Sequence, residues 1–166
     1  MRLSRAIATL GGVGTLPGAP GTWGSLAALP LGYLLHAVGG FGLLVLGTLL
    51  LGAVGWWAAR VEESATGAHD AGEIVIDEVV GQLLALWPLS AGLTHAGAEP
   101  WVFPWPGWLG AFVLFRLFDI WKPGPVGWAD RQPGATGVML DDVIAGVFAA
   151  LGVALAAYMA HGMMGV

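Results

Sequence analysis

The chain contains no cysteine and few charged residues. The missing thiol excludes a disulfide framework, a thiolate zinc site and a cysteine nucleophile. Charged residues make up 10% of the 166 positions, against about 25% in an ordinary soluble domain. Lys and Arg together number 6 and the net charge is -5, which excludes a nucleic-acid partner, because backbone phosphates are bound by clustered bases. The length fits a single domain, residues 1–166.

What the chain has instead is long apolar stretches. No charged residue occurs between Arg5 and Arg60, and none follows Asp142. A helix needs about 20 apolar residues to cross a hydrocarbon core of about 30 Å. The segments predicted to lie in a membrane are residues 25–59, 79–98, 101–118 and 143–166. The first is too long for one crossing, so we expect a break at Gly39-Gly40 that makes it a hairpin or a re-entrant segment.

Most of the charge gathers in two short stretches, residues 60–78 and 116–142. With the N-terminus in the cytoplasm, the predicted spans return both stretches and all basic residues to the cytoplasmic side, in agreement with the positive-inside rule. We therefore expect an all-α integral membrane helical bundle of four to five membrane segments, with an active site at its cytoplasmic face. The two stretches can meet in space on that face.

Glycine and proline recur between residues 11 and 25, where they exclude a regular helix. Thr22 and Ser25 stand just before an apolar run, at positions typical of N-caps. Free backbone N–H groups at such a helix start also suit a phosphate, which makes Thr22 a candidate phosphate ligand. A structural loop with an ordinary cap accounts for the same residues.

An acidic pair, Asp77-Glu78, stands at the start of the predicted span 79–98. Two carboxylates at a membrane boundary are costly unless they meet a cation, a base or water. Hard divalent cations such as Mg²⁺ prefer oxygen ligands of this kind. Acidic residues also favour a helix N-terminus without binding any ligand, so the pair alone does not establish a metal site.

Three charged residues at steps of three follow: Arg116, Asp119 and Lys122. If the helix continues through them, they share one side of it. A guanidinium and an ammonium can both hold phosphate oxygens, and Asp119 can pair with either or bind a metal. Alternatively, the two bases are membrane anchors that extend to lipid headgroups.

A second acidic pair, Asp141-Asp142, opens the last predicted span, and Asp130-Arg131 precede it. Asp141 by itself fits an N-cap. Two acidic pairs at two span ends on one face, with bases between them in sequence, predict a site through their combination rather than through any single member.

Together these stretches resemble the phosphatidylglycerophosphatase A family over about residues 11–150. The matching segments are residues 18–25, 69–70, 74–81, 115–123, 128–131 and 137–146. The order and spacing of several charged motifs make the resemblance specific, and no charged motif residue is missing. Gly124 stands where a bulkier residue is usual.

The resemblance implies a Mg²⁺-dependent lipid phosphatase of the bacterial inner membrane that removes the terminal phosphate of phosphatidylglycerophosphate and leaves phosphatidylglycerol. Its partners would be this lipid substrate and the surrounding membrane lipids. We assign one or two Mg²⁺ ions to the acidic residues Asp77, Glu78, Asp119, Asp141 and Asp142. We assign the phosphoryl oxygens to Arg116 and Lys122, with Arg131 and Thr22 as further contacts.

The catalytic assignments are His69, Asp70, Asp77 and Asp119. In this hypothesis water activated by Mg²⁺ attacks the phosphorus atom, and His69 or Asp70 passes a proton to the leaving alkoxide. An aspartyl-phosphate intermediate is the rival mechanism, and the sequence does not separate the two.

A small membrane channel or transporter subunit with an acidic ion path is the alternative function. Intramembrane acids would support it, but here the acids cluster at one face of the membrane and not at its midplane. A structural subunit that binds anionic headgroups is a third reading. The spacing of Gly47, Gly52 and Gly55 permits close helix packing and, with it, a homo-oligomer.

Overall fold

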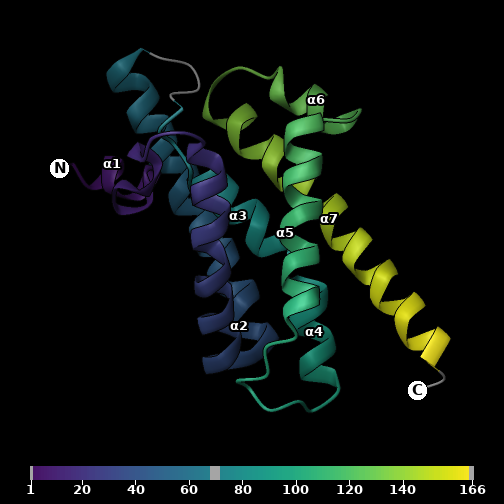
Figure 1. The fold of residues 1–166 in the computed structure, drawn as a ribbon. Coiled ribbons are helices and arrows are strands. Elements are labelled where there is room, and N and C mark those ends of the chain that lie inside the picture. The colour runs from purple at the N-terminus through teal and green to yellow at the C-terminus, as the bar shows by residue number, and fades with distance from the viewer. Residues whose placement is uncertain (1, 68–71, 165–166) are drawn as a thin grey trace.

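The computed structural model describes residues 2–67 and 72–164, and every regular element in that part of the chain is helical. In chain order these are α1 (Leu3–Ala8), the 3-10 helix η1 (Leu10–Thr15), α2 (Pro20–Thr66), α3 (Ile76–Ala85), α4 (Trp87–His95), α5 (Trp105–Trp121), α6 (Pro125–Asp130) and α7 (Gly134–Met164). The predicted all-α class is confirmed. Figure 1 shows α6 at one end of the bundle and the connection between α4 and α5 at the other.

Helix α2 folds back on itself at Gly39 and Gly40, so the predicted break is confirmed. Gly40 has φ 60° and ψ -154°, a backbone conformation that side chains with a Cβ rarely adopt. The two arms pack closely, because a Cβ added at Gly47 would lie 2.9 Å from Leu35 Cδ1. The first arm begins at Pro20 and not at residue 25, since proline fits the first turn of a helix.

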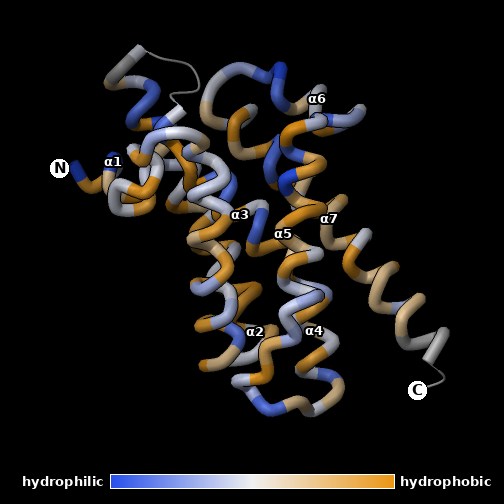
Figure 2. Tube along the Cα trace, in the orientation of Figure 1, coloured by the Kyte–Doolittle hydropathy of each residue, from blue (hydrophilic) through white to orange (hydrophobic). Residues whose placement is uncertain are grey.

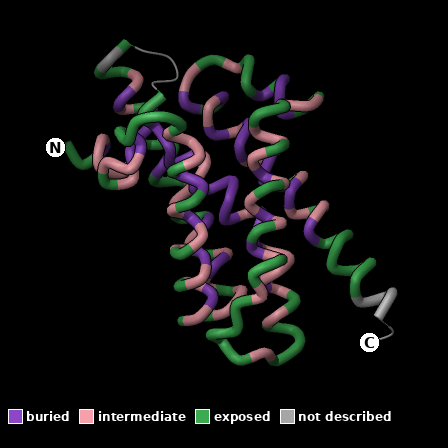
Figure 3. The backbone as a smooth tube through the Cα atoms, in the orientation of Figure 1, coloured by how far each residue is buried: buried purple, intermediate pink, exposed green. Residues whose placement is uncertain are grey.

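The short helix α3 lies at the centre of the bundle, between α2, α5 and α7 (Figure 3). Most of its residues are buried, including the polar Asp77 and Gln82 as well as its apolar side chains. The predicted span 79–98 is divided between two helices. Helix α3 ends at Ala85, and after Leu86 helix α4 begins at Trp87 with Pro88 in its first turn, where a missing N–H costs least.

Two glycines set the distance between α3 and α7. A Cβ added at Gly146 of α7 would lie 2.5 Å from the carbonyl oxygen of Gly81 and 3.0 Å from its Cα. The two backbones therefore touch, as they do at small-residue contacts between membrane helices. This contact fixes where the acidic residues of α3 stand relative to those of α7.

Two helices in the described part of the chain are long and apolar enough to cross a membrane, over Pro20–Ala65 and Gly134–Ala160. Figure 2 shows hydrophilic segments at the end of the bundle that carries α6 and in the connection between α4 and α5 at the other end, with mostly apolar colours along α7. The far half of α7 stands away from the other helices and exposes apolar side chains such as Leu151 and Leu155. The four to five membrane segments remain a prediction.

Candidate active site

A cavity of about 290 Å³ opens where α3, α5, α6 and α7 meet. Its lining consists of Asp77, Glu78, Asp119, Lys122, Asp130, Val138, Asp141 and Asp142. Six of these eight residues are acidic, and Lys122 supplies a positive charge. The expectation that the two charged stretches meet in space is thereby confirmed.

Helix α3 contributes Asp77 and Glu78 from its first turn. Asp77 is 6% exposed, and its Oδ1, like Glu78 Oε2, has no hydrogen-bond partner among the described residues. Burial raises the pKa of the Asp77 carboxyl well above its usual value, and the negative charge of Glu78 raises this pKa further. A buried carboxylate with a free oxygen is costly without a counter-charge, so this pair calls for a cation.

Helix α7 contributes Asp141 and Asp142, which are 6% and 3% exposed. The alternative explanation of Asp141 as an N-cap is wrong, because α7 already begins at Gly134. Glu63 from the end of α2 supports this earlier start, since its Oε2 accepts a hydrogen bond from Ala135 N at 2.9 Å. The acids therefore lie about two turns inside the helix, where Asp142 Oδ1 has no partner among the described residues.

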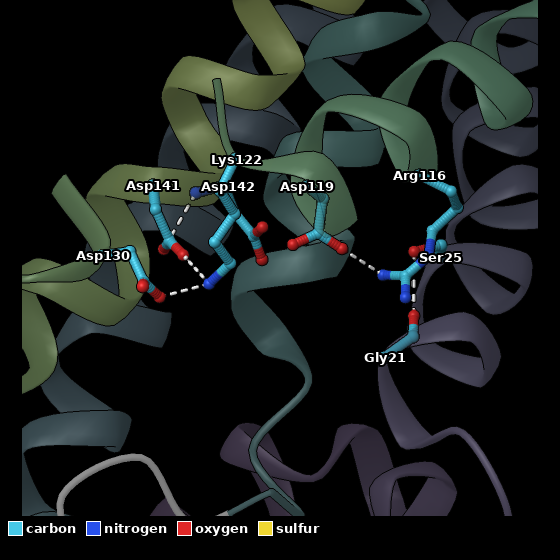
Figure 4. A network of polar contacts seen from close by, with 8 residues as sticks. All are labelled: Gly21, Ser25, Arg116, Asp119, Lys122, Asp130, Asp141 and Asp142. Carbon is cyan, nitrogen blue, oxygen red and sulfur yellow. Dashed lines mark hydrogen bonds and ion pairs between the residues drawn. The ribbon is translucent and has the colours of Figure 1, made fainter. Parts of the chain in front are cut away.

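Lys122 joins α5, α6 and α7. The helix does not continue through it, because α5 ends at Trp121 and Lys122 adopts a left-handed conformation with φ 48°. The condition under which all three charged residues would share one side of a helix is therefore not met. Its Nζ donates to Asp141 Oδ2 at 2.9 Å and also to Asp130, as Figure 4 shows. Burial alone would lower the pKa of the Lys122 ammonium, but these two hydrogen bonds raise it above its usual value. Lys122 thus places an ammonium group beside the acidic residues of the cavity.

Arg116 and Asp119 pair with each other one turn apart on α5, which is one of the alternatives that their spacing left open. Asp119 faces the cavity, whereas Arg116 does not line it and lies behind Asp119 toward α2 (Figure 4). The guanidinium is largely buried, and its Nε has no partner among the described residues. Arg116 is therefore adjacent to the cavity, and its Nε–H is available to donate a further hydrogen bond.

The first turn of α2 packs directly against these residues. A Cβ added at Gly21 would collide with Glu78 Oε1 and lie 3.2 Å from Arg116 Nη1, so a larger residue there would displace the Glu78 side chain. Thr22 and Ser25 lie inside the helix and are not N-caps, a role that falls to Ala19. Ser25 Oγ donates to the carbonyl oxygen of Gly21 at 2.8 Å.

The remaining candidates lie elsewhere. Thr22 is half-buried on α2 and does not line the cavity, and Arg131 is exposed at the end of α6. His69 and Asp70 lie outside the described residues. Asp130 is the charged lining residue to which the sequence assigned no role, although its place beside Arg131 in a charged motif was visible.

The carboxylates fit a divalent cation. Asp77, Glu78 and Asp142 each offer an oxygen, and these atoms lie within 4.8 Å of one another, as do oxygens of Asp119, Asp141 and Asp142. Ions such as Mg²⁺ and Ca²⁺ bind oxygen ligands at about 2.0–2.6 Å, so oxygens this far apart can share one ion. The unpartnered oxygens of Asp77, Glu78 and Asp142 are buried and accept no hydrogen bond from any described residue.

Comparison with known proteins finds the family that the sequence motifs resemble. The family model described as phosphatidylglycerophosphatase A matches residues 6–157. Proteins named phosphatidylglycerophosphatase A from Escherichia coli K12 and Haemophilus influenzae are each 36% identical to the chain; the matches cover 84% of this chain and 74% and 80% of those proteins. A Bacteroides thetaiotaomicron protein named putative phosphatidylinositol-3-phosphatase is also 36% identical, over 87% of both chains.

No solved structure matches the chain significantly. The family match spans nearly its whole length and includes all the elements that line the cavity. The chain therefore belongs to the phosphatidylglycerophosphatase A family.

Proposed function

We propose that this protein hydrolyses the terminal phosphate monoester of phosphatidylglycerophosphate, leaving phosphatidylglycerol and inorganic phosphate. The observation that carries the proposal is family membership over residues 6–157, combined with an acidic cavity built by four helices of that region. A phosphate monoester dianion resists nucleophilic attack, so an enzyme must neutralise its charge and align the nucleophile. The cavity has residues suited to both tasks.

The acidic residues would hold Mg²⁺, with Asp77, Glu78 and Asp142 as the principal ligands and Asp119 and Asp141 beside them. When bound, this ion supplies neutralising charge and lowers the pKa of water. Lys122 lies in the cavity wall and would hold a phosphoryl oxygen. Arg116 would add a planar pair of donors from behind Asp119. Thr22 and Arg131 would contact outer parts of the headgroup.

In the reaction, the oxygen of water forms a bond to phosphorus while the bond from phosphorus to the glycerol oxygen breaks. The departing alkoxide takes up a proton, for which His69 or Asp70 is our candidate donor. The rival route places the phosphoryl group on Asp77 or Asp119 before water releases it. Mass spectrometry of the protein quenched during turnover separates the two, because only the rival yields a phosphorylated Asp.

The placement of the site suits a lipid substrate. Helix α7 has its cavity residues near its N-terminal end and then continues as an apolar helix, so the cavity would sit at one membrane surface. The acyl chains can then remain in lipid while the phosphorylated headgroup meets the acids and bases. By the positive-inside rule we place this surface in the cytoplasm of a multi-pass protein of the bacterial inner membrane.

Phosphate release from the purified protein tests the function. In detergent with Mg²⁺, we expect inorganic phosphate from phosphatidylglycerophosphate, a fall to background after chelation with EDTA, and recovery when excess Mg²⁺ is added. Phosphatidylinositol 3-phosphate is the comparison substrate, because one relative carries that specificity in its name. Ion flux across sealed vesicles without phosphate release would instead support a channel or transporter.

A further inference from the structure

The acidic residues of the cavity form two overlapping groups. One consists of Asp77, Glu78 and Asp142, and the other of Asp119, Asp141 and Asp142. In each group one oxygen per residue lies within 4.8 Å of the other two. Asp142 belongs to both, and a carboxylate has two oxygens with which it can serve two neighbouring ions.

The two groups differ in how far their oxygens are already used. In the first, Asp77 Oδ1, Glu78 Oε2 and Asp142 Oδ1 are buried and have no hydrogen-bond partner among the described residues. In the second, Asp119 pairs with Arg116, and Asp141 accepts from Lys122 Nζ at 2.9 Å and from the backbone N–H of Asp142 at 3.0 Å. Each carboxylate of the first group therefore offers a cation one oxygen without a hydrogen bond, whereas in the second group both Asp141 oxygens and one Asp119 oxygen already have partners.

We propose that the cavity contains two cation positions of unequal affinity that share Asp142, and that the weaker one fills when a phosphate draws Arg116 and Lys122 away from Asp119 and Asp141. This inference rests on the proposed function. The tight position is formed by the first group. The weaker position is formed by the second, where the guanidinium and the ammonium compete with an incoming ion for the same oxygens.

The movement of Arg116 and Lys122 from the carboxylates to a phosphate follows from their charge. A phosphate monoester or inorganic phosphate is an anion that offers Arg116 and Lys122 new partners. When these side chains turn to it, the Asp119 and Asp141 carboxylates become free for the second ion. Phosphate and the second cation then strengthen each other's binding by the same factor, because coupling between two ligands is reciprocal. The arrangement would thus complete the site only when substrate or product is present.

Equilibrium binding of Mn²⁺, followed by electron paramagnetic resonance of the full chain in detergent, tests this. We expect one tightly bound Mn²⁺ per chain in the absence of phosphate. Millimolar inorganic phosphate should raise the affinity for a second ion at least about fivefold and produce a spin-coupled pair. A single ion at saturating Mn²⁺ and phosphate, in protein that cleaves the lipid, would overturn the inference and leave the proposed function intact.

Variants separate the two positions without relying on turnover. Asp119→Asn should remove the second ion and keep the first, whereas Glu78→Gln should weaken the first. Lys122→Met should raise the affinity for the second ion in the absence of phosphate, because the competing ammonium is gone. Glu99→Gln, an exposed acid outside the cavity, should behave as wild type. Unchanged second-ion affinity in Lys122→Met would contradict the competition.

The outcomes also separate this inference from the function itself. Protein that binds no Mn²⁺ and releases no phosphate from the lipid would overturn both. Two ions with equal affinities, unaffected by phosphate, would overturn the inference alone.

Discussion

Asp142→Asn is expected to lower the turnover of phosphatidylglycerophosphate by about 10³-fold, the scale seen when one preorganised group at a reacting centre is lost. Asp142 is 3% exposed, belongs to both groups of potential metal ligands and keeps one oxygen unpartnered among the described residues. Asparagine preserves the shape of the side chain but replaces an anionic ligand with a neutral one. The loss should therefore be in cation binding and turnover rather than in folding.

The same variant should not lose thermal stability, although it loses activity. Without metal, several carboxylates crowd one buried cavity, and removing one uncompensated charge relieves their repulsion. The Tm of Asp142→Asn in EDTA should therefore equal or exceed that of wild type. The assay is phosphate release at saturating lipid and Mg²⁺, with thermal unfolding in detergent alongside and Glu99→Gln as the control for acid-to-amide exchange. Near-normal turnover would remove Asp142 from the site.

Gly146→Ala is expected to reduce turnover by about 100-fold although residue 146 carries no reactive group, since misplacement of about 1 Å can have that effect. A Cβ there would lie 2.5 Å from the Gly81 carbonyl oxygen, and backbone cannot move aside as a flexible side chain can. Helices α3 and α7 must separate, and Asp77 then moves away from Asp142. Overpacking of this kind also destabilises the fold by about 1–3 kcal/mol.

Two other glycines provide a graded comparison. A Cβ at Gly152 of α7 would meet the end of Leu114 at 3.0 Å, which can shift, and one at Gly110 of α5 would meet nothing within 4 Å. Turnover should fall steeply only for Gly146→Ala, slightly for Gly152→Ala and not for Gly110→Ala. Circular dichroism confirms that each variant remains helical. Equal turnover in all three would show that the α3–α7 contact does not position the acids.

Local signals in the sequence were sufficient for several features of this fold. The break at Gly39-Gly40 was predictable because paired glycines interrupt an apolar run too long for one crossing. The position of Asp77-Glu78 at a helix start was predictable because acids favour that end of a helix. The meeting of the two charged stretches followed from placing both on one side of a membrane.

Other features depend on contacts between distant residues. Helix α7 begins at Gly134 with support from Glu63, which is remote in sequence and belongs to α2. Lys122 leaves the helix and turns to Asp130 and Asp141, a choice that the spacing of charges on α5 could not show. Gly21 lies close to Glu78 and Arg116, which belong to two other helices. Each of these three features is determined by contacts between helices, which local sequence signals do not show.

The most direct test of a shared cation site is a crystal structure of the protein grown with Mn²⁺, with anomalous scattering used to locate the ion. The account predicts an anomalous peak inside the cavity, within about 2.0–2.6 Å of oxygens from both Asp77 and Asp142. It is contradicted if catalytically active crystals place these two carboxylates too far apart to bind one ion, or show the manganese bound elsewhere.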